Sequence, residues 1–114
     1  MEPFAASKTS RRINADIAMR IFVAVNQIAE INFRQTTALL IASLVRRDCE
    51  VHLVDVDAFS YLGNEDCHRF FANTLELDTK ATADSTDVQN FARADGARKP
   101  FQLQPGNVIL IRTN

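Results

Sequence analysis

The sequence is short of glycine and has no long apolar run. Its glycines all lie at or after Gly63, so none follows the first expected strand. Dinucleotide-binding turns and P-loops need glycine at that point, because the backbone must approach a phosphate closely. The chain therefore carries neither motif. No apolar stretch is long enough to cross a bilayer, and the first residues lack the apolar core of a secretory signal.

A strong net charge is also missing. The formal net charge is -1, and the arginines occur as scattered pairs such as Arg11-Arg12 and Arg46-Arg47. There is no basic surface that would attract nucleic acid or an anionic membrane. Cys49 and Cys67 form neither a CxxC motif nor a disulfide framework. We therefore expect a cytoplasmic protein that binds neither nucleic acid nor membranes.

What the sequence does contain is the strand and helix alternation of an α/β fold. Residues 20–25 are apolar and rich in β-branched side chains, as in a buried parallel strand. Thr36 and Thr37 offer hydroxyls that can cap a helix ending near Arg47, and a second strand is expected at 50–56. The later segments predict a β-hairpin at 60–62 and 67–77, a short helix at 84–94 and a last strand at 108–112.

These segments predict a small three-layer Rossmann-like domain, with a mostly parallel sheet and a β-hairpin insertion. The strand, helix and strand from 20 to 56 form a βαβ unit, whose crossover is right-handed. The first strand is expected between the second and the last. Residues 1–18 are polar and lack apolar periodicity, so a flexible tail is predicted there and the domain itself at 19–114.

Candidate binding residues lie in the loop after the first strand. Asn26, Gln27 and Asn32 have polar side chains at the carboxyl end of the expected central strand, where open α/β sheets meet their ligands. The equally weighted alternative is a plain surface loop whose side chains bond their own backbone.

Arg112 is the fourth candidate, at the tip of the last strand. A guanidinium at that position could form a forked pair with a ligand carboxylate. The alternatives are a solvated strand end and a salt bridge to Asp55 or Asp57.

No catalytic residue and no metal site is predicted. His52 lies inside a strand, and His68 adjoins Cys67, where neighbouring side chains on a strand face opposite sides. A structural role is favoured for both histidines. The neutral amides of Asn26 and Gln27 also occupy the point where a phosphoacceptor domain would hold Mg²⁺ with carboxylates.

The order of the segments resembles the N-terminal domain of prokaryotic-type glutathione synthetase, which precedes an ATP-grasp core. The resemblance covers about residues 19–114 and leaves the tail unmatched. The stretches that carry it are 19–23, 28–32, the Thr36-Thr37 helix, 46–51, 57–62, the hairpin and 107–112.

The resemblance implies a family of ATP-dependent carboxylate–amine ligases that join γ-glutamylcysteine to glycine. It implies that this domain helps to form the dipeptide pocket, with Asn26, Gln27, Asn32 and Arg112 as substrate-binding residues. ATP and Mg²⁺ are bound beyond the matching region in this family, so the chain is expected to hold no cofactor and to be inactive alone.

The implied partner is the missing ATP-grasp core, supplied in cis or in trans. The alternative is a stand-alone interaction module that docks onto a separate ATP-grasp ligase. Without the core, Ile109 and Ile111 of the last strand should be partly bare, and we expect homo-oligomers to form.

Overall fold

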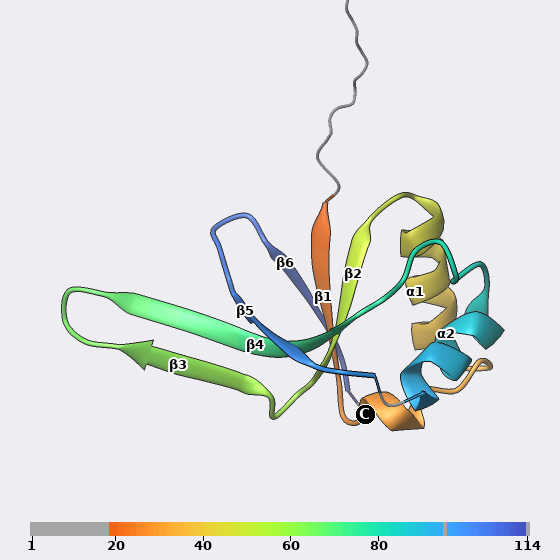
Figure 1. Cartoon of the computed structure of the whole chain (residues 1–114), viewed down its shortest axis with the longest axis horizontal. Helices are drawn as coiled ribbons and strands as arrows, with labels where there is room; N and C mark the ends of the chain where they lie inside the picture. The colour runs from red at the N-terminus through yellow and green to blue at the C-terminus, as the bar shows by residue number, and fades with distance from the viewer. Residues whose placement is uncertain (1–18, 95, 114) are drawn as a thin grey trace, which may run out of the picture.

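The computed structural model describes residues 19–94 and 96–113, so the tail predicted at 1–18 lies outside the described residues (Figure 1). The described part is a compact α/β domain with a mixed sheet. Its helices are α1 (Thr36–Arg46), α2 (Ser85–Arg93) and the short 3-10 helix η1 (Ile28–Glu30). Its strands are β1 (Arg20–Val25), β2 (Glu50–Asp55), β3 (Phe59–Gly63), β4 (His68–Glu76), β5 (Lys99–Gln102) and β6 (Val108–Arg112).

The strand order is β3-β4-β2-β1-β6, and β5 pairs with β4 off this path. The parallel pairing of β1 with both β2 and β6 confirms that β1 lies between the second and last strands. The prediction of a mostly parallel sheet is wrong. β4 is antiparallel to β2, β3 and β5, and the tight turn between β3 and β4 accounts for the antiparallel pairing of these two.

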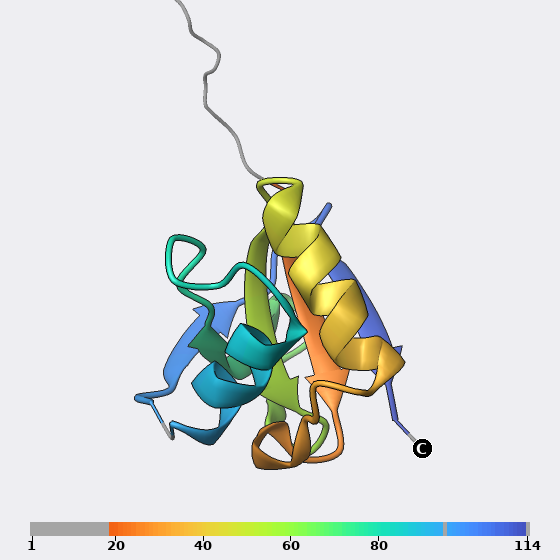
Figure 2. The same cartoon turned by 90° about the vertical axis from the view of Figure 1, so that its right-hand side faces the viewer.

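A three-layer arrangement requires helices on both faces of the sheet, and the helices of the described residues do not lie on both. In the described residues α1 and α2 pack against each other on one face (Figure 2). The segment after α2 forms β5 instead, and Phe101 and Leu103 cover part of the opposite face around Phe22. The space that a second helix layer would fill is therefore partly occupied by a strand.

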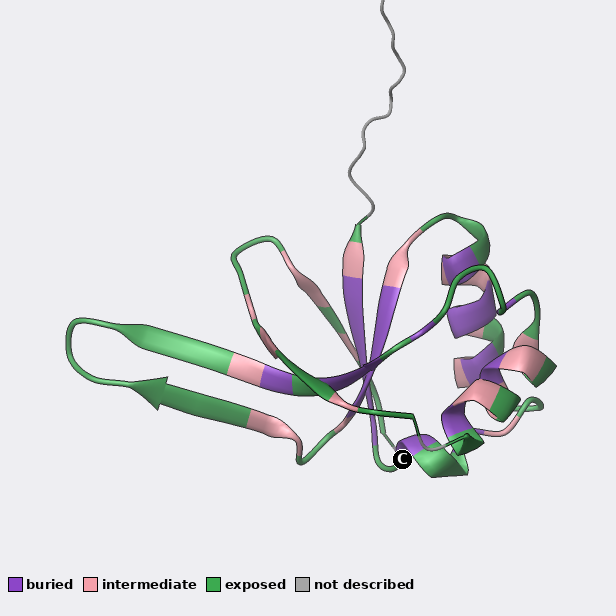
Figure 3. Ribbon diagram, viewed as in Figure 1, coloured by how far each residue is buried: buried purple, intermediate pink, exposed green. Residues whose placement is uncertain are grey.

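The main core lies between the sheet and the two helices (Figure 3). It is built from alternate strand residues and from the inner helix faces, because successive strand side chains point to opposite faces. Its buried side chains include Ile21, Val23, Val25, Ile28, Ile41, Val51, Leu53 and Val88. This core holds η1 and the start of α1 against the carboxyl end of β1.

The edge strand β6 divides its side chains between the core and solvent. Val108 and Leu110 pack against the helix-side core, whereas Ile109 is 41% exposed and Ile111 is 66% exposed. The predicted exposure of these two isoleucines is confirmed. The β3–β4 hairpin projects from the body, and Tyr61, Leu62 and Phe70 are exposed on it (Figure 1).

Candidate functional site

The carboxyl ends of β1 and β6 form a cleft together with the start of α1. Val25 and Arg112 are register partners, so the loop after β1 lies beside the tip of β6. The cleft has a volume of about 360 Å³, and its lining residues are Val25, Asn26, Gln27, Glu30, Ile31, Arg34, Gln35, Thr36, Thr37 and Arg112. Three of the four residues predicted from the sequence, Asn26, Gln27 and Arg112, are thus brought to one place.

Asn32 lies in the same loop but does not line this cleft. Its Oδ1 accepts a hydrogen bond from the backbone N–H of Arg34 at 2.9 Å, and its own N–H donates to Gln35 Oε1 at 3.0 Å. The side chain of Asn32 therefore organises the loop, as in the alternative in which polar side chains bond their own backbone.

Arg112 is not paired with either aspartate that the sequence offered. The Asp55 carboxylate accepts from Arg98 Nη1 at 2.7 Å and from the backbone N–H of Ile28 at 2.7 Å, which anchors η1. The exposed Arg112 guanidinium instead has its Nε 3.5 Å from Thr37 Oγ1, at the outer limit of a hydrogen bond. Arg112 lines the cleft, and its exposed guanidinium can donate to a ligand there.

The first turn of α1 adds donors to the cleft. The helix begins at Thr36 and its N-cap is Gln35, which makes no side-chain capping bond. The predicted capping by Thr36 or Thr37 is therefore wrong, because both residues lie inside the first turn. Backbone N–H groups in a first turn have no intrahelical acceptor and carry partial positive charge.

The charges that line the cleft favour an anionic ligand. Arg34 and Arg112 contribute two guanidinium groups, against the single carboxylate of Glu30. The loop sequence contained Arg34, but nothing in it indicated that Arg34 and Thr37 would lie near Arg112. That proximity depends on the pairing of β6 with β1.

A second polar group lies at the opposite end of the sheet, around His52. The ring is completely buried, with Nδ1 3.0 Å from Thr74 Oγ1 and Nε2 2.6 Å from Glu50 Oε2. Arg20 Nε donates to the same Glu50 oxygen at 2.5 Å. Burial raises the pKa of Glu50, but the hydrogen bonds and charges of His52 and Arg20 outweigh it and hold that pKa below its usual value.

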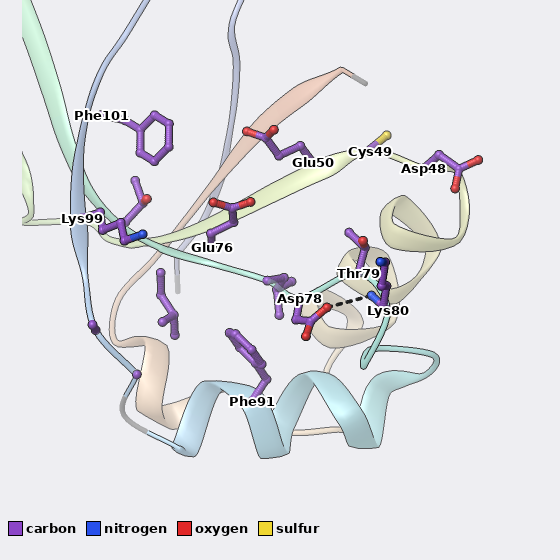
Figure 4. Close-up of a pocket in the computed structure, with 15 residues that line it drawn as sticks. Asp48, Cys49, Glu50, Glu76, Asp78, Thr79, Lys80, Phe91, Lys99 and Phe101 are labelled. Carbon is purple, nitrogen blue, oxygen red and sulfur yellow. Dashed lines mark hydrogen bonds between the residues drawn. The ribbon is translucent and has the colours of Figure 1, made fainter. Parts of the chain in front are cut away.

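A larger pocket of about 850 Å³ opens beside this group (Figure 4). Its lining residues include Glu50, Thr74, Glu76, Phe91 and Phe101. The expected structural role of His52 agrees with its position between two aromatic rings. Its ring stacks on Phe22 with 5.1 Å between the ring centres, and it meets Phe101 edge-on with 4.4 Å between the centres.

The chain matches no family model, no curated protein and no solved structure. Among the helices in the described part of the chain, none is both long and apolar enough to span a membrane. The fold and the first cleft define a compact α/β domain with a polar cleft of ligand size at the carboxyl edge of its parallel strands.

Proposed function

We propose that residues 19–114 are a substrate-binding and scaffold domain of the Rossmann-like, pre-ATP-grasp type found in prokaryotic glutathione synthetase. The observation that carries this proposal is the meeting of Asn26, Gln27 and Arg112 in one cleft. These residues come from distant parts of the sequence, and the parallel β2-β1-β6 arrangement brings them to the edge where such sheets bind ligands.

The cleft suits a small carboxylate ligand such as γ-glutamylcysteine. Its volume of about 360 Å³ falls in the range of small-molecule sites. Arg112 and Arg34 can meet carboxylates with charge-assisted hydrogen bonds, which are stronger than neutral ones. The amides of Asn26 and Gln27 offer both donors and acceptors to the dipeptide's peptide group and ammonium group.

The cleft does not fit ATP or Mg²⁺. Mg²⁺ prefers carboxylates and water in octahedral geometry, whereas Glu30 is the one carboxylate among the described residues that line the cleft. None of the described lining residues is a glycine that could let the backbone approach a phosphate. In this proposal the ATP-grasp core supplies nucleotide and metal, in cis or in trans. The domain alone has no ligase activity, and the protein acts in the cytoplasm.

Calorimetric titration with γ-glutamylcysteine tests this function. We expect binding without ATP or Mg²⁺, because the residues that face the dipeptide all belong to the cleft. The analogue with both carboxylates converted to carboxamides should not bind, since it cannot pair with the guanidinium groups. Equal binding of the analogue, or no binding of the dipeptide, would refute the proposal.

The exposed edge of β6 favours a docking role as the second candidate function. Ile109 and Ile111 form an apolar strip on a strand that pairs on one side with β1. In this alternative the domain is a stand-alone module, and the strip docks onto a separate ATP-grasp ligase. In the isolated chain the same strip can pair with a second copy.

Substitution of Ile111 by aspartate is expected to abolish self-association. A charge on this strip cannot be buried without a large desolvation cost, so sedimentation equilibrium should find a monomer where the wild-type chain forms dimers or larger species. Leu39→Asp is the matched control, since Leu39 is an exposed apolar residue on α1. A wild-type chain that stays monomeric at high concentration, or an equal effect of both substitutions, would contradict this docking surface.

A further inference from the structure

We propose that Glu50, His52 and Glu76 bind a divalent transition-metal ion, with Zn²⁺ as the best match to their donor set. One ligand atom from each residue lies within 4.8 Å of the other two. Glu50 and His52 are two positions apart on β2 and so share a face, and His52 is the register partner of Glu76 on β4. Figure 4 shows the Glu50 and Glu76 carboxylates on the same side of these two strands.

The separations are close to those that a bound ion needs. Zn²⁺ binds imidazole nitrogen and carboxylate oxygen at about 2.0–2.2 Å, so two ligands in a tetrahedral site lie about 3.4 Å apart. His52 Nε2 and Glu50 Oε2 are 2.6 Å apart and must separate slightly, and Glu76, whose ligand atom lies within 4.8 Å of both, must adjust to the same spacing. Rotation of the glutamates accomplishes both changes, because Glu76 is exposed and Glu50 is half-buried.

His52 is oriented as a metal-ligating histidine is, with a hydrogen-bonding partner at each ring nitrogen. Its Nε2–H donates to Glu50 Oε2 at 2.6 Å when no ion is present, and an ion that takes the place of this proton at Nε2 leaves Nδ1 to donate to Thr74 Oγ1, 3.0 Å away. Such an outer hydrogen bond fixes the ring orientation and the tautomer of a metal ligand. Phe22 and Phe101 confine the ring, so little side-chain entropy is lost when an ion binds.

Arg20 provides the positive charge at this position when no ion is present. Its Nε lies 2.5 Å from Glu50 Oε2, and its guanidinium lies 5.0 Å from the centre of the Phe101 ring. An incoming ion must displace Arg20 from Glu50. Arg20 is the first residue of β1 and its side chain is partly exposed, so it can turn toward solvent. The 850 Å³ pocket gives the ion access to Glu50 and Glu76.

An ion bound by these three residues keeps open coordination positions. Three protein ligands, one imidazole and two carboxylates, are the number found in zinc sites that keep water as a further ligand. The donor set contains no thiolate, which distinguishes it from a site built on Cys49 or Cys67, both free in the structure.

The experiment uses the chain with both cysteines replaced by serine, so that thiolates do not capture the ion. Zn²⁺ titration by calorimetry and Co²⁺ titration by visible absorption should each give one site per chain. Glu76→Gln is expected to weaken binding by about tenfold or more, since it removes a ligand from the exposed side. Arg20→Ala is expected to tighten binding by about tenfold, because it removes a competing cation.

Glu65→Gln is the matched control, because Glu65 is an exposed acid in the β3–β4 turn. It should leave the affinity unchanged. The ¹⁵N signal of His52 Nε2 in the otherwise unaltered chain should shift on Zn²⁺ binding. Unchanged affinity in Glu76→Gln, a response of His68 without one of His52, or no stoichiometric binding would overturn the proposal. None of these outcomes depends on whether the dipeptide binds at the other end of the sheet.

Discussion

Replacement of Arg112 by alanine is expected to weaken γ-glutamylcysteine binding by about 10- to 100-fold. Arg112 lines the cleft, and its guanidinium can donate two parallel hydrogen bonds to a carboxylate. Hydrogen bonds to charged groups contribute about 1.5–3 kcal/mol, which corresponds to this range of affinity. Isothermal titration of both proteins measures the change directly.

The substitution should leave the fold intact, because Arg112 is exposed at the end of β6. Arg112→Lys should recover part of the affinity, since lysine keeps the charge but lacks the planar fork. Arg47→Ala is the matched control: it removes an exposed arginine at the other end of α1. An equal loss in Arg47→Ala would indicate a general charge effect and would contradict a specific role for Arg112.

Replacement of His52 by alanine is expected to lower the free energy of unfolding by about 3 kcal/mol. The ring is completely buried between Phe22 and Phe101, so its removal leaves a cavity. It also removes the buried hydrogen-bond partner of Thr74 and one of the two partners of Glu50. Urea unfolding followed by circular dichroism should show a lower midpoint with little change in slope.

His68→Ala provides the comparison for this prediction. His68 is exposed on the hairpin and stacks on Tyr61, so its loss should cost less than about 1 kcal/mol. Similar midpoints for the two variants would contradict the account of the core, because they would mean that the buried ring contributes no more than the exposed one.

The strands that flank the first cleft were predictable because their signal is local. Apolar, β-branched runs mark β1, β2 and β6, and the parallel pairing of β1 with both β2 and β6 agrees with its predicted central position. The hairpin turn was equally predictable, because residues 63–66 form a cluster of turn-favouring residues. In the structure Asn64 Oδ1 accepts hydrogen bonds from the N–H groups of Asp66 and Cys67. β5 was not predicted, because Pro100 indicates a break. An edge strand tolerates proline, and within the described ranges β4 is the one strand with which β5 pairs.

The candidate sites were predictable only in part, because long-range contacts complete them. The positions of Asn26, Gln27 and Arg112 at strand ends followed from the sequence, but the course of the loop did not. It depends on Asp55, which binds the N–H of Ile28, and on Gln89 Oε1, which accepts from Phe33 N–H at 2.9 Å.

The group of Glu50, His52 and Glu76 at the other end of the sheet also depends on a long-range contact. The sequence placed His52 on a strand but gave no register between that strand and the one carrying Glu76. The antiparallel return of β4 along β2 sets this register and brings Glu76 opposite His52. Such a group of ligands has no spacing motif that a sequence comparison could detect.

Amide chemical-shift mapping of the ¹⁵N-labelled chain during γ-glutamylcysteine addition is the most direct test of the cleft. The account predicts the largest shifts at Asn26, Gln27, Thr36, Thr37 and Arg112, with little change along the β3–β4 hairpin. Saturable shifts centred on the hairpin or on the pocket beside Glu76, with the β1–α1 loop unmoved, would contradict it.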